Sequence, residues 1–178
     1  MNRSKLKKIM LTALNAAILC ILAPLSIPVG TVPISLATLA VYFIGIILPP
    51  FLALSSVLCY ILLGAVGLPV FSGFTGGISV LLGPTGGYIM GYIPCILIIS
   101  FLAKKCEKKP YILAMVLILG TLSCYFFGTL FFMIQANCGF FEALFTCVLP
   151  FFLGDALKIA CTLAVAPKLR QKLIERIY

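Results

Sequence analysis

The chain has 178 residues, of which 63% are hydrophobic and 10% charged, and it contains neither histidine nor tryptophan. Soluble domains are typically about half apolar and about one quarter charged, so the composition excludes a soluble or disordered chain. The mean hydropathy of +1.24 indicates an integral membrane protein. Because a bilayer-spanning helix needs about 20 apolar residues, this length accommodates six spans in a single transmembrane domain, residues 1–178, with short loops.

All basic residues except Lys158 gather in three clusters, at residues 3–8, 104–109 and 168–176, and the net charge is +9. Each cluster borders an apolar segment, which argues against a nucleic-acid-binding surface and matches the excess of Lys and Arg in cytoplasmic loops of membrane proteins. We therefore expect both termini on the cytoplasmic side of a bacterial-type cell membrane. The partners expected from charge alone are the bilayer and its anionic lipids, and no nucleic acid.

Apolar segments separated by breaks that contain proline or glycine predict an all-α, six-helix transmembrane bundle. The expected helices cover residues 8–25, 35–48, 51–67, 84–103, 111–134 and 147–166. An even number of spans places the termini and the middle basic cluster on one side, in agreement with the charge pattern. The glycine-rich segment 68–83 is too apolar for a solvated loop, so we expect it to fold over the outer end of the bundle and to contain a short helix.

Asp155 and Lys158 are charged residues inside an apolar segment. A charge at mid-membrane is expensive, and such residues usually face a cavity or pair with one another. At a spacing of i, i+3 the two side chains share one helix face and partly neutralise each other. The pattern predicts a polar recognition point facing an internal cavity. The alternative is a buried ion pair that locks the last helix to the bundle.

Residues 83–88, GPTGGY, predict the start of a helix at the outer end of the bundle, since proline is favoured in the first turn. We expect the backbone N–H groups of Thr85, Gly86 and Gly87 to face outwards, where helix N-termini bind anionic groups, with the Tyr88 ring beside them. An ordinary helix start with tight packing is the alternative interpretation.

Five further residues are candidate ligand contacts. Phe71, Gly76 and Gly77 precede the helix start, and aromatic side chains above a cavity hold flat apolar ligands. The alternative for this group is an aromatic belt at the membrane interface. Thr38 and Tyr42, four residues apart on the second expected helix, lie on one face and offer polar contacts from another wall.

The chain lacks the residues that several kinds of catalytic and metal site require. The eight cysteines include no CxxC pair, and without histidine we expect neither a metal site nor a bound cofactor. Cys138 and Cys147 flank an expected outer loop, and whether they pair is left open. No GxxxxGK[ST] phosphate loop and no histidine-containing triad occur, so we do not expect an enzyme or ATP hydrolysis by this chain.

Four motifs resemble those of one known family. Residues 67–92, GLPVFSGFTGGISVLLGPTGGYIMGY, look like the signature of the BioY family, the biotin-specific substrate-binding subunits (S components) of energy-coupling factor transporters. Residues 32–43, VPISLATLAVYF, are similar to the second-helix motif of that family, and residues 154–158, GDALK, to its last-helix motif. Ala13 and Ala17 match the small-residue motif by which such subunits contact a coupling protein, and small residues suit close helix approach in any case.

The resemblance implies a six-helix membrane subunit that binds biotin near its outer face through Asp155 and Lys158. It also implies partners on separate chains, namely a transmembrane coupling protein and two ATPase subunits. The competing hypotheses are an S component for another vitamin and a stand-alone facilitator or channel for biotin. A membrane-embedded enzyme and a purely structural bundle are the remaining classes.

Overall fold

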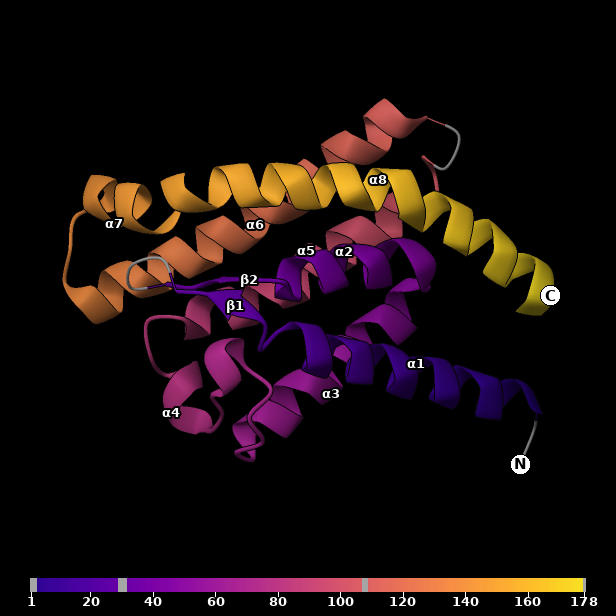
Figure 1. Ribbon diagram of the computed structural model, residues 1–178, viewed down its shortest axis with the longest axis horizontal. Helices are drawn as coiled ribbons and strands as arrows, with labels where there is room; N and C mark the ends of the chain where they lie inside the picture. The colour runs from indigo at the N-terminus through magenta and orange to yellow at the C-terminus, as the bar shows by residue number, and fades with distance from the viewer. Residues whose placement is uncertain (1–2, 29–31, 107–108, 178) are drawn as a thin grey trace.

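The computed structural model describes residues 3–28, 32–106 and 109–177 and is drawn in Figure 1. Within these ranges the chain forms eight α-helices, a 3-10 helix and a two-stranded hairpin, which confirms the expected all-α class. The elements are α1 (Arg3–Leu22), β1 (Ser26–Ile27), β2 (Ile34–Ser35), α2 (Ala37–Ile47), α3 (Pro50–Ala65), η1 (Ser72–Phe74), α4 (Ile78–Leu81), α5 (Gly86–Ala103), α6 (Pro110–Ala136), α7 (Phe140–Cys147) and α8 (Leu149–Ile177).

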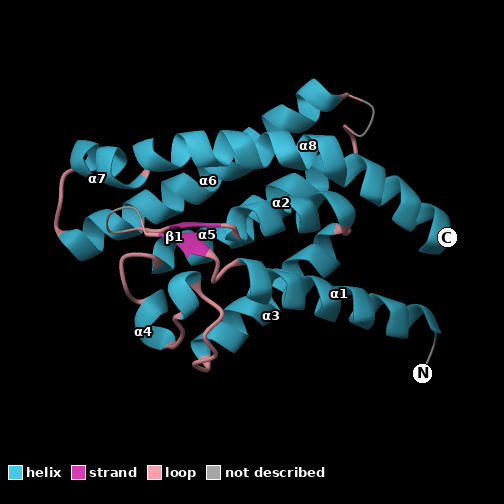
Figure 2. Cartoon of the chain, in the orientation of Figure 1, coloured by secondary structure: helices cyan, strands magenta, loops and turns pink. Residues whose placement is uncertain are grey.

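The long helices run along one direction, so the bundle has two distinct ends (Figures 1 and 2). The beginning of α1, the connection from α5 to α6 and the last turns of α8 lie at one end, which we call the basic end. The β1–β2 hairpin, α4 and α7 lie at the opposite end, which we call the hairpin end. The described parts of the three basic segments therefore lie at the same end of the molecule, as their pattern predicts.

Prolines set several helix boundaries. Pro49 precedes α3, and Pro50 and Pro110 occupy first helical positions, where a missing N–H costs nothing. The expected final helix differs from the observed one, because the connecting segment forms α7 and a break at Val148 separates α7 from α8. Pro150 lacks the N–H that would continue the preceding turn. At its other end α8 runs on to Ile177, well past its apolar part.

Within the described part of the chain, two helices, α5 and α6, are long and apolar enough to cross a membrane by length and composition. The bent pair α7 and α8 meets the same criterion when the two are taken together, which raises the number to three. Helices α2 and α3 are shorter apolar helices. The six spans and the cytoplasmic position of both termini therefore stay predictions.

Helix α5 is central: it packs along α6 and also against α2 and α3. Its close approach to α6 depends on glycine, since a Cβ on Gly91 would lie 3.1 Å from the Cα of Cys124. A Cβ on Gly120 of α6 would in turn lie 2.9 Å from Cγ1 of Ile99. Small residues at these positions allow the two backbones to come together, as is typical of membrane helices.

The segment between α3 and α5 folds over the hairpin end and contains η1 and the short helix α4, as expected. Its backbone is tied to the bundle by the Gly73 N–H, which donates to the Pro24 carbonyl oxygen at 3.1 Å. The Gln135 side chain at the end of α6 donates to the Leu82 carbonyl oxygen at 2.6 Å. These bonds hold the segment above the ends of α1 and α6.

Candidate ligand-binding site

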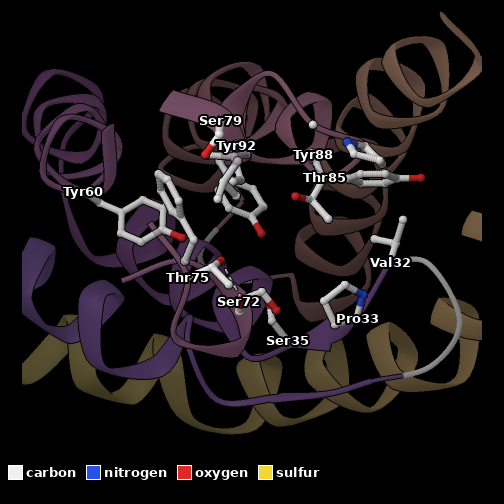
Figure 3. A pocket seen from close by; sticks show the side chains of 15 residues that line it. Val32, Pro33, Ser35, Tyr60, Ser72, Thr75, Ser79, Thr85, Tyr88 and Tyr92 are labelled. Carbon is white, nitrogen blue, oxygen red and sulfur yellow. Dashed lines mark hydrogen bonds between the residues drawn. The ribbon is translucent and has the colours of Figure 1, made fainter. Parts of the chain in front are cut away.

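A cavity of about 390 Å³ opens at the hairpin end, between the α3–α5 segment and the β1–β2 hairpin. Figure 3 shows it from close by, with tyrosine rings from α3 and α5 facing side chains of the hairpin region. We call it the outer cavity; its lining residues are Val32, Pro33, Ser35, Tyr60, Phe71, Ser72, Thr75, Ser79, Val80, Gly83, Pro84, Thr85, Tyr88, Ile89 and Tyr92. The volume falls within the range of about 300–1,000 Å³ that is common for small-molecule sites.

The wall of the outer cavity is aromatic. The rings of Tyr60 and Phe71 meet edge to face with centroids 5.5 Å apart, and Tyr60 also lies 6.5 Å from Tyr92. Phe71 is fully buried because Gly64 of α3 leaves room for its ring, where a Cβ would lie 2.1 Å from it. Hydroxyl groups of serine and threonine complete the lining, so the cavity combines an apolar surface with neutral hydrogen-bonding groups.

A second, smaller cavity of about 40 Å³ adjoins the first. The two share Val32, Pro33, Ser35, Tyr88 and Tyr92. The smaller one, which we call the inner cavity, is completed by polar and aromatic side chains from α2, α6 and α8, namely Thr38, Cys124, Tyr125, Phe151, Asp155 and Lys158. The apolar outer cavity therefore leads to a polar group of side chains within the bundle.

The charged pair on α8 lies at this inner cavity and is almost fully buried, with 5% of the Asp155 and 9% of the Lys158 side chain exposed. Lys158 Nζ donates to Asp155 Oδ1 at 2.8 Å and to Thr38 Oγ1 at 2.9 Å. Thr38 Oγ1 donates to Asp155 Oδ1 at 3.2 Å, and the Tyr125 hydroxyl donates to Asp155 Oδ2. We call these four residues the polar network, and it joins α2, α6 and α8.

Local structure brings the four side chains together. The spacing of Asp155 and Lys158 puts both on one face of α8. Thr38 lies in the first turn of α2, directly after the hairpin, where Ser35 Oγ accepts a bond from the Ala37 N–H at 3.2 Å. The pair is thus an ion pair within α8 that Thr38 and Tyr125 tie to α2 and α6, and it is also part of a cavity wall. Both interpretations left open by the sequence, a group facing a cavity and a pair that ties the helix to the bundle, fit this arrangement.

Six of the predicted ligand contacts line a cavity. Phe71 and Thr85 line the outer cavity, Thr38, Asp155 and Lys158 line the inner cavity, and Tyr88 lines both. The ring of Tyr88 stacks on Phe151 of α8 with centroids 6.3 Å apart. Whether these side chains contact a ligand stays a prediction.

The glycines predicted as ligand contacts have packing and backbone roles. The Gly86 N–H, expected to face outwards, donates instead to the Gly83 carbonyl oxygen at 2.9 Å, which corrects that expectation. A Cβ on Gly86 would lie 1.8 Å from the Leu81 carbonyl oxygen, and one on Gly87 would lie 2.3 Å from Phe131 Cβ. These contacts support the alternative of tight packing at the helix start.

Gly76 and Gly77 likewise line neither cavity. A Cβ on Gly76 would lie 2.2 Å from the Leu68 carbonyl oxygen, and Gly77 has a φ of +100°, which L side chains rarely adopt. The Gly77 N–H donates to the Gly64 carbonyl oxygen at 2.7 Å. Both glycines are therefore needed to fold the segment back onto α3.

Tyr42 lies deeper than the cavities and lines neither of them. It is fully buried, and its hydroxyl pairs with Thr121 Oγ1 of α6 at 2.5 Å. Elsewhere, Ala13 and Ala17 are exposed on α1, and no disulfide joins Cys138 to Cys147. Among the described residues no group of acidic, cysteine or histidine side chains is arranged to hold a metal ion.

Sequence reasoning missed several lining residues, above all Tyr60, Tyr92 and Tyr125. One signal was present: Tyr88 and Tyr92 are four residues apart and so share a face of α5. A tyrosine inside an apolar helix also needs a partner for its hydroxyl. No such signal marks the hairpin residues Val32 and Pro33, because their position depends on the pairing of β1 with β2.

A model of the BioY family matches residues 1–175, almost the entire chain. The chain belongs to the BioY family. A probable biotin transporter BioY from Pyrococcus horikoshii is 37% identical over 166 residues, which cover 93% of this chain and 98% of that relative. Biotin transporter BioY2 from Lactococcus lactis is 40% identical over 130 residues, which cover 73% of this chain and 71% of that relative.

A solved structure matches the fold as well. It is the S-component for biotin from an ECF-type ABC transporter, determined by crystallography at 2.1 Å. The match has a TM-score of 0.89 and 30% sequence identity, and it covers 96% of this chain and 94% of that one. This BioY-family chain therefore shares the helical membrane architecture of that component over nearly its full length.

Proposed function

We propose that this chain is the biotin-binding S component of an ECF-type vitamin uptake transporter. The observation that carries the proposal is the buried polar network at the end of an aromatic cavity, in a chain whose fold matches a biotin S-component. Buried charges that line a cavity in a membrane protein mark substrate sites more often than they serve stability alone. Biotin is captured at the hairpin end, which faces the outside of the cell.

The chemistry of biotin suits the two cavities. Its fused rings carry a ureido group with two N–H donors and an oxygen acceptor, a thioether and a carboxylate tail. With the ring end inside, Asp155 accepts a ureido N–H and Lys158 donates to the ureido oxygen. With the tail inside, Lys158 instead donates to the carboxylate. The rings of Tyr60, Phe71 and Tyr92 pack against the apolar parts.

Transport needs partners on other chains. A transmembrane coupling protein and two ATPase subunits supply the energy, and this chain itself performs no catalysis. Ala13 and Ala17 are exposed on α1, and small side chains at this spacing let a helix of the coupling protein pack closely. Replacing both by leucine is expected to reduce co-purification with the coupling protein, and unchanged recovery would contradict this assignment.

Equilibrium binding of biotin to the purified chain in detergent or nanodiscs tests the proposal, with riboflavin and thiamine as controls. Tight and selective binding of biotin by this chain alone is the expected result. A folded protein without biotin binding would overturn it, and selective binding of a control vitamin would reassign the ligand. Wild-type affinity in both Asp155→Asn and Lys158→Ala would overturn the site assignment.

Biotin flux into vesicles that contain only this chain separates capture from transport. We expect no net flux without the ATPase partners. Measurable flux would instead identify a stand-alone facilitator, which is the alternative function for the same site.

A further inference from the structure

Tyr125 was not expected at the site, yet it contacts the buried carboxylate of Asp155. It projects from α6, lines the inner cavity and donates its hydroxyl hydrogen to Asp155 Oδ2. The carboxylate belongs to α8, so this bond crosses between helices. A hydrogen bond to a buried charge is stronger than one between neutral groups, and its loss is correspondingly costly.

The two oxygens of Asp155 have different surroundings. Oδ1 accepts bonds from Lys158 Nζ at 2.8 Å and from Thr38 Oγ1 at 3.2 Å, which use both of its lone pairs. Oδ2 accepts one bond, from Tyr125, which is its sole donor within the described ranges. One lone pair of Oδ2 is therefore open to a further donor.

The open lone pair matters because Asp155 and Tyr125 line the same cavity. An aspartate side chain rotates about χ2 with a broad preference, so bonds to Oδ1 alone leave the plane of the carboxylate poorly defined. A second bond to Oδ2, from a different helix, fixes that plane. Because the Tyr125 hydroxyl uses one lone pair of Oδ2, the other lone pair of Oδ2 remains available as an acceptor.

We propose that Tyr125 is a positioning residue that orients Asp155 so that Oδ2 accepts an N–H donor of the ligand, and thereby selects for ligands with such a donor. The inference rests on the proposed function, since it concerns how the same site distinguishes a cyclic urea from similar molecules. Tyr125 acts through Asp155 and need not touch the ligand. Correct orientation of a buried acceptor is what allows a site to reject an analogue that lacks the donor.

The first test compares two ligands in three proteins. The ligands are biotin and an analogue in which one ureido N–H is replaced by N–CH₃, and the proteins are wild type, Tyr125→Phe and Thr121→Val. Thr121→Val is the matched control, because it removes one buried hydroxyl from the same helix, one turn away and outside both cavities. We expect Tyr125→Phe to weaken biotin binding about tenfold and to narrow the preference for biotin over the analogue, whereas Thr121→Val keeps the wild-type preference.

A second test asks whether Tyr125 acts through Asp155. In the Asp155→Asn background, Tyr125→Phe is expected to cause no further loss of affinity, because the carboxylate that it orients is gone. The variant Tyr125→Leu removes the hydroxyl with a different apolar shape, so that a packing defect in one variant does not decide the result. Thermal unfolding of each variant confirms that it is folded.

Two results would overturn the inference: equal losses of affinity for both ligands in folded Tyr125 variants, or the same loss in the Asp155→Asn background as in wild type. Either would show that Tyr125 has only a structural role. Failure of the wild-type protein to bind biotin at all would instead refute the proposed function, so the two failures are distinguishable.

Discussion

Helices α2 and α6 each carry a threonine and a tyrosine one turn apart. Across the two helices these residues form two threonine–tyrosine pairs, which have different bonding partners. At the inner cavity, Thr38 of α2 and Tyr125 of α6 both bond to Asp155. One turn closer to the basic end, Tyr42 of α2 and Thr121 of α6 bond to each other at 2.5 Å. The residue types and helices are the same, so what differs is the charged pair that α8 places beside the first pair only.

The hydroxyl groups of the deeper pair, Tyr42 and Thr121, are satisfied without any charged partner. The Thr121 hydroxyl donates to the Leu117 carbonyl oxygen at 2.8 Å, so Tyr42 is the donor in the bond between them. Both side chains are buried and line no cavity in the described structure. The comparison teaches that a polar side chain in an apolar helix signals a buried partner, and that a ligand site additionally needs an open cavity and an incompletely used charge.

Removing the charge of Asp155 should have the largest effect on biotin affinity, because only the pair at the inner cavity contacts that charge. Asp155→Asn is expected to weaken biotin binding by about 100-fold, since a hydrogen bond to a charged acceptor is lost, and to leave Lys158 buried without a counter-ion. The double variant Asp155→Asn with Lys158→Met removes both charges. We expect it to recover much of the thermal stability but none of the affinity, as measured by unfolding and by biotin titration. Recovery of binding in the double variant would contradict a recognition role for the pair.

A smaller effect is expected at the segment that covers the outer cavity. Gly86→Ala places a Cβ 1.8 Å from the Leu81 carbonyl oxygen, so the turn into α5 must shift, at a cost of about 1–3 kcal/mol in the free energy of unfolding. Gly139→Ala is the control, because no atom lies within 4 Å of the added Cβ and its φ of −70° suits alanine. Its free energy of unfolding should change by less than about 1 kcal/mol. Equal destabilisation of the two variants would argue against the close contact at Gly86.

The smallest effects are expected when the threonine of each pair is replaced by valine. Thr38→Val removes a donor to Asp155 and an acceptor for Lys158, and it should weaken biotin binding by about tenfold. Thr121→Val leaves the Tyr42 hydroxyl without its acceptor and should lower the free energy of unfolding by about 1–2 kcal/mol, with unchanged affinity. Titration and chemical unfolding of both variants measure the contrast. A loss of affinity in Thr121→Val would show that the deeper pair belongs to the site.

The fold and its charged pair could be predicted from sequence because they depend on local patterns. Apolar runs, prolines and basic clusters define the helices and their common end, and the spacing of Asp155 and Lys158 defines a helix face. Whether Tyr42 or Tyr125 contacts the charged pair depends on which turns of α2 and α6 face α8. That is set by helix packing and cannot be read from local sequence. For the same reason, the roles of Gly86 and Gly76 became clear only from the backbone atoms around them.

Directly beyond the deeper pair, Ile99 of α5 fills the space between α2 and α6. It is fully buried, and a Cβ added to Gly45 would lie 2.7 Å from its Cγ2. Beyond the inner cavity, α2 and α6 thus present first a neutral hydroxyl pair and then, around Ile99, close-packed hydrocarbon. Movement of a ligand past the polar network would therefore require α2, α5 and α6 to separate at these glycine contacts.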